Sequence, residues 1–382
     1  MFIIRWNQIK EVLNSGTTKG ELKMTNKNYQ LVIVGYGGMG SYHAKHLLKE
    51  NQNITVVGTY DVSEGRRAAS ITDGYKAYES LSAVLADDEV DFVLIATPND
   101  VHKEIAIAAL NAKKHVICEK PVTIYSEELV EIMEAAKLND RKFIVHQNRR
   151  WDEDFLTIKK IHDEQTIGDV FHIESRVQGA NGIPGDWRHL KNFGGGMLLD
   201  WGVHLLDQLL FMVDSKITSI YAHLSYVLGD EVDDGFQAFI TFENGITSLV
   251  EVGTTNFVQL PRWYTKGTKG TAVIHDWDIN GKVVTQNLDE NVEAPKPIKA
   301  GQGLTKTMAP PSEKAVSTSE LPKVEKTMES FYENVVSVVE GKAEPIVKND
   351  EVLRVLQLIE TIFKAAETNE VIKEFDRTRV HG

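Results

Sequence analysis

The fold is decided by the stretch Gln30-Leu31-Val32-Ile33-Val34-Gly35-Tyr36-Gly37-Gly38-Met39-Gly40. Its first half is a short apolar run, which is typical of a buried parallel strand. Its second half has the spacing G-x-G-x-x-G, and a helix with one apolar side is expected to follow. Glycines at a strand-to-helix turn let the backbone approach a pyrophosphate and leave helix N-terminal amides free to bind it. The stretch therefore predicts a dinucleotide site formed by Gly35, Tyr36, Gly37, Gly38, Met39 and Gly40.

An acidic residue follows the second expected strand, Ile54 to Tyr60. Asp61 stands 21 residues after Gly40, where a carboxylate accepts hydrogen bonds from the adenosine ribose and repels a 2′-phosphate. This position favours NAD as the cofactor. Arg66 and Arg67 lie close enough to leave NADP open. The alternative interpretation is a plain glycine turn with a capping aspartate.

Strands and helices keep alternating up to about residue 148. We expect strands at 92–96, 114–118 and 142–145, and helices at 102–112 and 126–137. Such βα units build one parallel sheet, a doubly wound Rossmann fold that binds its ligands at the carboxyl ends of the strands.

Two loops at that edge carry polar side chains. Thr97-Pro98-Asn99 follows one strand and is expected to face the nicotinamide ribose, although a plain turn also explains Pro98 and Asn99. Glu119-Lys120-Pro121 closes the next strand and places an ammonium group where a hydride would move.

From Trp151 the pattern changes to one helix, up to about His162, followed by strands that alternate in the antiparallel manner. Examples of the expected strands are 171–177, 217–227, 236–242 and 246–252, with an Asn-Gly hairpin turn at 243–245 between the last two. We therefore expect a second α/β domain with an open, largely antiparallel sheet, closed by helices at about 323–340 and 351–367.

The division that follows is an N-terminal extension at 1–23, a dinucleotide-binding domain at 24–148 and a substrate and oligomerisation domain at 149–382. The extension fits the rest poorly, because Met24 already supplies a start and Lys19-Gly20-Glu21 could be encoded by a ribosome-binding sequence. We expect that it is not translated natively; a short amphipathic helix is the alternative. The polar, proline-bearing segment 286–322 is too long for an idle connection and could be a lid, an oligomer arm or a mobile loop.

Composition indicates a soluble enzyme of the cytoplasm. The 382 residues suffice for two cores, and the formal net charge of −13, from 42 Lys and Arg against 55 Asp and Glu, argues against nucleic acid as a partner. The single cysteine, Cys118, excludes an intrachain disulfide and a cysteine-rich zinc site. No apolar run reaches the length of a membrane span, and the order of a signal peptide is missing.

A second polar set lies behind three glycines, Gly194 to Gly196. Asp200 and His204 stand four residues apart, so they share one face of a helix. With Lys120 they form a carboxylate, imidazole and ammonium set suited to alcohol oxidation: the imidazole takes the hydroxyl proton, and the ammonium stabilises the developing alkoxide. A histidine merely satisfied within a helix is the alternative for His204.

Taken together, these motifs resemble those of the Gfo/Idh/MocA family of sugar and inositol oxidoreductases, over nearly everything after Met24. The matching motifs are Gly35-x-Gly37-x-x-Gly40, Thr97-Pro98-Asn99 with His102, Glu119-Lys120-Pro121 and Gly195-Gly196-x-Leu198-x-Asp200-x-Gly202-x-His204-x-x-Asp207. Segment 286–322 and the extreme N-terminus depart from the pattern.

The resemblance implies that Lys120 binds the substrate hydroxyl near the nicotinamide, with Asp200 and His204 orienting substrate and transferring the proton. It also implies a sheet that often builds dimers or tetramers. The residues that it assigns to the cofactor are Thr97, Pro98, Asn99, His102, Glu119 and Lys120, with Trp187 and Arg188 over cofactor or substrate. Asn148 and Arg150 match a motif at the domain junction, where a substrate contact and a structural role are both open.

We therefore expect an NAD-dependent dehydrogenase, with NADP not excluded and no metal, that reversibly oxidises a secondary hydroxyl of a sugar, inositol or glycoside. A homodimer or homotetramer is expected. One alternative is an enzyme that retains NAD and cleaves glycosides through transient ring oxidation. The other is a dinucleotide-binding regulatory sensor, which would be free to lose Lys120 or His204, and both are present.

Overall fold

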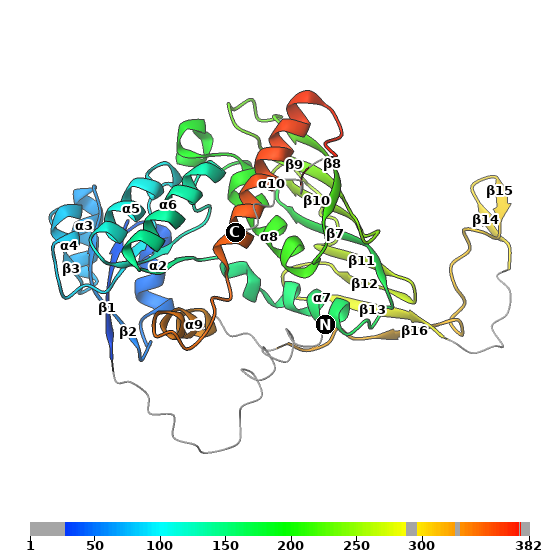
Figure 1. The fold of residues 1–382 in the computed structure, drawn as a ribbon. Helices are drawn as coiled ribbons and strands as arrows, with labels where there is room; N and C mark the ends of the chain where they lie inside the picture. The colour runs from blue at the N-terminus through cyan, green and yellow to red at the C-terminus, as the bar shows by residue number, and fades with distance from the viewer. Residues whose placement is uncertain (1–26, 288–295, 325–328, 374, 376–382) are drawn as a thin grey trace, which may run out of the picture.

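A computed structural model describes residues 27–287, 296–324, 329–373 and 375 (Figure 1). The expected extension at 1–23 lies outside the described residues. No helix within these ranges is long and apolar enough to cross a membrane.

The first half of the chain forms a six-stranded sheet in the order β3-β2-β1-β4-β5-β6, with every neighbouring pair parallel. The strand order reverses between β1 and β4, which is where a doubly wound sheet binds its ligand. The strands are β1 Tyr29–Val34, β2 Ile54–Tyr60, β3 Lys76–Ala77, β4 Phe92–Ile95, β5 His115–Cys118 and β6 Phe143–Val145. The Rossmann fold predicted from the sequence is confirmed.

Helices cover this sheet (Figure 1). The helix after the fingerprint begins as an α-helix, α2, and continues as a π-helix, η1. The helical segments are α2 Gly38–Tyr42, η1 His43–Leu47, α3 Glu64–Thr72, α4 Leu81–Leu85, η2 Asn99–Val101, α5 His102–Asn111 and α6 Ser126–Asn139.

The second half forms an eight-stranded sheet in the order β16-β13-β12-β11-β7-β10-β9-β8. Only the β7 and β10 pair is parallel; the other pairs are antiparallel, as expected. The strands are β7 Val170–Gln178, β8 Ile217–Ser225, β9 Gly235–Phe242, β10 Thr247–Gly253, β11 Trp263–Gly267, β12 Gly270–Ile274, β13 Gly281–Gln286 and β16 Val316–Ser319. At the hairpin between β9 and β10, Gly245 adopts a φ of +88°, which glycine tolerates best.

Helices pack on one face of this sheet, and side chains alternate along β8 and β9 between that buried face and an open one. The segments are η3 Asn148–Trp151, α7 Glu153–Asp163, η4 Trp187–His189, η5 Lys191–Phe193, η6 Leu198–Gly202, α8 Val203–Met212, α9 Glu329–Val339 and α10 Asn349–Thr368.

The two closing helices connect the two cores. Side chains of α9, such as Phe331 and Val335, pack in the core of the first sheet. Helix α10 contributes Val352 and Leu356 to that core and Leu358, among others, to the core of the second sheet. The apolar side of this helix therefore packs in two cores at once.

The described parts of segment 286–322, residues 286–287 and 296–322, contain regular structure. They form a hairpin of β14, Ile298–Ala300, and β15, Gly303–Thr305, that projects from the body (Figure 1), and then the edge strand β16 beside β13. These strands were not predicted, because they are short and mostly exposed and so carry no apolar alternation.

Candidate active site

The glycines of the fingerprint divide into two kinds. A Cβ on Gly35 would lie 2.5 Å from the carbonyl oxygen of Ala96, and one on Gly40 would lie 1.9 Å from that of Gly35, so only glycine fits at both positions. A Cβ on Gly37 or Gly38 would meet nothing within 4 Å. The backbone is thus packed tightly at both ends of the motif and open in the middle, which is the arrangement that a pyrophosphate needs.

The two side chains of the fingerprint also differ. Tyr36 is buried and donates its hydroxyl to Asp73 Oδ2 at 2.8 Å. Met39 is partly exposed on the first turn of α2. Tyr36 therefore contributes to the core, while Met39 stands beside the open glycines.

Asp61 is fixed at the carboxyl end of β2. Its carboxylate accepts the backbone N–H groups of Tyr36 and Ser63, each at 2.8 Å, which holds it beside the fingerprint. Arg67 donates Nη1 to the carbonyl oxygen of Asp61 at 2.6 Å, whereas Arg66 is exposed. Of the two arginines whose positions left NADP open as the cofactor, Arg67 is thus hydrogen-bonded to the local backbone.

Lys120, Asp200 and Arg188 form a charged cluster across the two halves of the chain. Lys120 Nζ lies 3.2 Å from Asp200 Oδ1 and 3.0 Å from the Asp200 carbonyl oxygen, while Arg188 Nε lies 3.2 Å from Asp200 Oδ2. The side chains of Lys120 and Asp200 are 16% and 13% exposed. Burial opposes ionisation of Asp200, but the two cations outweigh it and lower the pKa of the carboxyl below its ordinary value. Asp200 is therefore a carboxylate that bridges two cations.

His204 is buried one turn further along, in α8. Its Nδ1 has no hydrogen-bond partner among the described residues. Burial, and then the positive charges of Lys120 and Arg149, lower its pKa well below the usual value for histidine. The imidazole is consequently neutral at neutral pH and able to accept a proton. The sequence predicted one regular helix here; the structure instead places Asp200 in the π-helix η6, ahead of α8.

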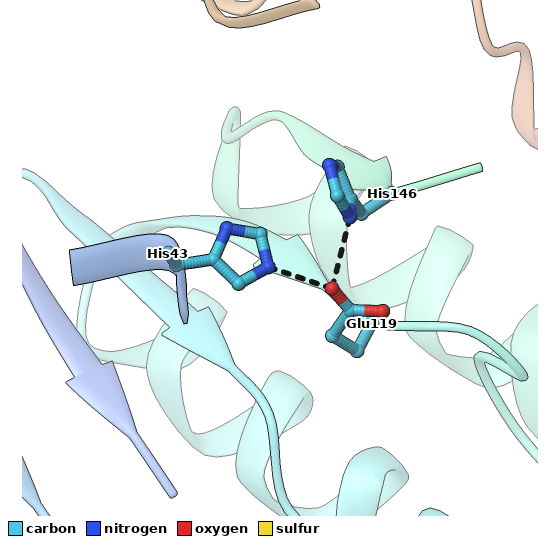
Figure 2. A group of neighbouring side chains, drawn as sticks. All are labelled: His43, Glu119 and His146. Carbon is cyan, nitrogen blue, oxygen red and sulfur yellow. Dashed lines mark hydrogen bonds and ion pairs between the residues drawn. The ribbon is translucent and has the colours of Figure 1, made fainter. Parts of the chain in front are cut away.

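Glu119 lies at the centre of a buried hydrogen-bonded network (Figure 2). Its Oε1 accepts from His43 Nε2 at 2.6 Å and from His146 Nδ1 at 2.9 Å, and its Oε2 accepts the backbone N–H of Lys120 at 3.2 Å. Burial lowers the pKa of His43, so that ring is neutral and its Nδ1 accepts from the Tyr332 hydroxyl. The network joins the fingerprint helix, the strand end before Lys120, β6 and α9.

Two imidazoles and a carboxylate are also a familiar set of metal ligands. In this cluster, however, the nitrogens of His43 and His146 both point at the same oxygen of Glu119, at hydrogen-bond distances. The ligand atoms face one another rather than a shared position for a cation, so we interpret the cluster as a hydrogen-bonded network. Glu119, predicted as a cofactor contact, therefore has its carboxylate directed into the core.

The loop after β4 packs against neighbouring loops. Asn99 is buried and donates Nδ2 to the carbonyl oxygen of Gly194 at 3.1 Å. His102 lies between the carbonyl oxygens of Thr97, at 2.9 Å, and Pro121, at 3.1 Å. These two side chains, predicted at the cofactor, hold the loops in place. The Oγ1 of Thr97 is buried without a partner in the described part of the chain, and Pro98 leads into η2.

Trp187 and Arg188 lie in η4, where the guanidinium of Arg188 stacks over the indole at 4.6 Å. Asp186 accepts Arg188 Nη1 at 2.7 Å. This pair was predicted over the cofactor or the substrate, and the structure brings Arg188 to Asp200, beside Lys120.

The two junction residues in η3 differ. Arg150 is buried and donates to both carboxylate oxygens of Asp207, at 2.7 and 2.8 Å, to Glu351 Oε2 at 2.8 Å and to the carbonyl oxygen of Ile346 at 3.0 Å. Of the two roles left open for Arg150, this geometry supports the structural one rather than a substrate contact. Asn148 keeps a buried Oδ1 with no partner in the described ranges.

Several residues near the site were not singled out from the sequence. Arg149 stacks over Trp201 at 4.2 Å, and Trp201 lies 5.9 Å from the ring of His204. Trp277, in the loop after β12, lies 6.1 Å from Trp201. The position of Trp201 between Asp200 and His204 was a usable signal, whereas nothing marked Trp277 as close to the site.

Comparison with known proteins identifies both halves of the chain. Residues 29–147 match the family described as "Oxidoreductase family, NAD-binding Rossmann fold", and residues 155–273 match the "GFO/IDH/MocA C-terminal domain". The solved structure of an NAD-binding protein from Listeria innocua is 63% identical, with a TM-score of 0.89, and the match covers 91% of this chain and 99% of that one.

Curated relatives are more distant. An uncharacterized oxidoreductase of Schizosaccharomyces pombe is 29% identical over 342 residues, which is 80% of this chain and 88% of the relative. An inositol 2-dehydrogenase of Salmonella typhimurium is 32% identical over 227 residues, covering 58% of this chain and 66% of that enzyme. With a fingerprint that fits a dinucleotide and both domains matched, the chain belongs to the Gfo/Idh/MocA family and is an NAD(P)-dependent oxidoreductase.

Proposed function

We propose that the enzyme reversibly oxidises a secondary hydroxyl of a sugar, an inositol or a glycoside to a ketone. The observation that carries this proposal is the approach of Lys120 Nζ to Asp200, 3.2 Å from Oδ1, with the buried His204 one turn beyond. Ammonium, carboxylate and neutral imidazole are the groups that alcohol oxidation requires. The inositol 2-dehydrogenases among the relatives support a cyclic polyol as the substrate class.

In this mechanism a nicotinamide bound beside the fingerprint would supply the acceptor for the hydride. His204 takes the hydroxyl proton, because its lowered pKa keeps the ring neutral at the working pH. The ammonium of Lys120 stabilises the negative charge that develops on the substrate oxygen. Asp200 holds this ammonium through Oδ1 and Arg188 through Oδ2, so both cations stay in place before the substrate arrives. The loops held by Asn99 and His102 keep the strand ends fixed around them.

We propose NAD as the preferred cofactor, because the Asp61 carboxylate is fixed where it would repel a 2′-phosphate. The Asp61→Ala variant should shift the preference, measured as the ratio of kcat/KM for NAD and NADP, toward NADP. Ser63→Ala, in the same turn, removes no charge and should leave the ratio unchanged. If Asp61→Ala also leaves the ratio unchanged, Asp61 does not read the ribose.

We also propose a homo-oligomer in which a second copy covers the open face of the eight-stranded sheet. Tyr221 and Phe239 lie on that face, are partly exposed and pack with their ring centres 6.5 Å apart. Light scattering of the purified protein should give a dimer or a tetramer, and Phe239→Asp should weaken it. The buried thiol of Cys118 is compatible with a reducing compartment, and we propose a cytoplasmic location.

The test of the function is a panel of inositols, aldoses and glucosides, with NAD or NADP and initial rates read from cofactor reduction. If the proposal is correct, the ketone and the reduced cofactor form in equal amounts. Release of a sugar from a glucoside without net consumption of free NAD would instead indicate glycoside cleavage by a retained cofactor. Binding of NAD with no turnover of any compound would favour a regulatory sensor.

A further inference from the structure

Two tryptophans and two arginines form a stack beside the candidate active site, here called the indole platform: Trp201, Trp277, Arg149 and Arg262. The guanidinium carbon of Arg149 lies 4.2 Å from the ring centre of Trp201 and 5.4 Å from that of Trp277. Arg262 lies 4.7 Å from the ring centre of Trp277. Stacks of this kind between guanidinium and indole are attractive and hold the rings in place.

The platform begins at the proton-transfer residue. Trp201 stands between Asp200 and His204 in the chain, and its ring centre is 5.9 Å from that of His204. Trp277 lies 6.1 Å beyond Trp201. If the substrate ring that is oxidised lies beside His204, Trp277 is two ring contacts away from it. This separation suits contact with a second ring of the substrate rather than with the ring that carries the reacting carbon.

Hydrogen bonds to one side chain hold the loop that presents Trp277. Asp276 Oδ1 accepts the backbone N–H groups of Asp278 and Asn280, each at 3.1 Å, and Oδ2 accepts Asn280 Nδ2 at 2.9 Å. Ile279 adopts a φ of +61°, a left-handed conformation that is strained for a β-branched side chain. Strain of this kind is concentrated at functional sites. On this fixed loop Trp277 remains 50% exposed, although burial of a large indole would stabilise the fold.

The arginines of the platform retain unused donors. Arg149 Nε and Arg262 Nη2 are buried and have no hydrogen-bond partner in the described parts of the chain. A buried N–H group without an acceptor is costly, so each of these donors favours a ligand oxygen or a bound water. Arg149 Nη1 donates to Asp152 Oδ2 at 2.8 Å, whereas Arg262 donates Nη1 to the Arg176 carbonyl oxygen at 2.9 Å and pairs through Nε with Asp154 Oδ2 at 3.0 Å.

From these contacts we propose that the indole platform is a subsite for a second sugar ring, so that the substrate is a glycoside of at least two rings. The C–H groups of a sugar ring carry partial positive charge and pack on the negative face of an indole, and its hydroxyls accept hydrogen bonds from guanidinium N–H groups. The inference rests on the proposed oxidation of a ring hydroxyl. It adds that the ring beside His204 is one end of the substrate and that the next ring lies on Trp277.

The test compares Trp277→Ala with the wild type on substrates of one ring, myo-inositol and glucose, and of two rings, cellobiose, maltose and trehalose. Phe171→Ala is a matched control. Phe171 resembles Trp277 in that it is an aromatic residue, 45% exposed, beneath a cation, Lys266. It differs in position, because on β7 it stands four residues from Ser175, which pairs with Trp263 at the end of the sheet near Trp277. The second readout is calorimetric titration of the enzyme and NADH complex with each disaccharide.

The wild type should prefer at least one disaccharide. Trp277→Ala should lower kcat/KM for it about tenfold, through KM, because the loss of a stacked ring contact is of that size. The kcat/KM of Trp277→Ala for substrates of one ring should stay unchanged. Trp277→Phe should restore the preference for two rings. Phe171→Ala should leave kcat/KM unchanged for substrates of one ring and of two. A wild type without preference for two rings, or an equal loss for both classes in Trp277→Ala, would overturn the subsite.

Different results would contradict the proposed oxidation and the proposed subsite. If no carbohydrate is turned over, the proposed oxidation is wrong, and calorimetry then decides the subsite alone. Disaccharide binding that Trp277→Ala weakens would still support it. The absence of any heat with all three disaccharides would overturn it.

Discussion

At the scale of single residues, the pKa of His204 makes the most specific prediction. Burial and the charges of Lys120 and Arg149 lower this pKa well below 6.5, so the ring loses its proton at unusually low pH. The acidic limb of kcat/KM, which reports protonation of the base in the free enzyme, should therefore lie below pH 6.5. Arg149→Met removes one positive charge and should move this limb to higher pH. A limb at or above pH 6.5 in the wild type would argue against His204 as the base.

The residues of the candidate site were predictable from the sequence to different degrees. Lys120, Asp200 and His204 belong to motifs whose residue types suit one reaction, and the structure brings Lys120 to Asp200. Glu119 and His102 belong to the same motifs, yet their side chains point into the core or bind loop carbonyls. A motif indicates which loop lies near the ligand, but the direction of each side chain depends on packing partners far away in the chain.

At the scale of elements, the two π-helices within the described residues lie beside the candidate site: η1 begins with His43 of the Glu119 network, and η6 contains Asp200. Single turns of π-helix are frequent at functional sites. Asp233 fixes the start of η6, because its Oδ2 accepts the N–H of Leu198 at 2.8 Å. A Cβ on Gly196 would lie 2.3 Å from Asp233 Oδ1, so the carboxyl group is closely packed there.

Asp233 should make the stability of the fold depend on pH. Burial raises its pKa to about 7, so the folded state holds a proton that the unfolded chain releases at a lower pH. The stability that this proton contributes is fully present below the pKa of Asp233 in the unfolded chain. It is lost as the pH rises toward and through about 7, the pKa of Asp233 in the folded state. Stability should fall by up to about 1.4 kcal/mol per pH unit in that window.

Urea unfolding of the wild type and Asp233→Asn at pH 5 and pH 8 measures this effect. The asparagine variant keeps an acceptor for Leu198 and should show a smaller decrease in unfolding free energy between the two values. Asp234→Asn, at the neighbouring position, keeps the burial of Asp233 and removes only a minor charge that raises its pKa, so it should retain most of the decrease of the wild type. An identical decrease in the wild type and Asp233→Asn would contradict the assignment.

Strands β1, β2, β4, β5 and β6 of the first sheet were predicted closely because buried parallel strands are largely apolar, as in β4, whereas the two-residue β3 was not predicted. The strands β14, β15 and β16 were missed because they are mostly exposed. Pairing of such a strand depends on an available sheet edge, here β13, which the local sequence does not reveal.

At the scale of the whole molecule, two cores are joined by α10 and by buried ion pairs at the junction. Arg150 contacts Asp207 of α8 and Glu351 of α10, at 2.7 and 2.8 Å. Removing one partner leaves a buried charge uncompensated. Arg150→Met should therefore lower the free energy of unfolding by about 3–5 kcal/mol.

The double variant Arg150→Met with Asp207→Asn removes both charges of the buried pair and should recover a large part of this loss. Urea unfolding followed by tryptophan fluorescence measures both. A change below about 1 kcal/mol in the single variant would place the pair among weak surface contacts.

The contact between the two cores also explains why the candidate active site forms only in the complete fold. Lys120 comes from the end of β5 in the first half, whereas Asp200 and His204 come from η6 and α8 in the second. The sequence predicted both halves, but their meeting depends on α9, which packs in the core of the first sheet, and on α10, which packs in both cores.

The most direct test of the proposed chemistry is Lys120→Ala, with NAD binding and turnover measured on the same preparation. The fingerprint and Asp61 remain intact, so the dissociation constant for NAD should stay within about threefold, a change of less than 1 kcal/mol. Turnover of the best substrate in the panel should fall at least about a hundredfold, because the developing oxyanion loses its cation. Near-normal turnover with normal NAD binding would contradict the assignment of Lys120, and with it the proposed active site.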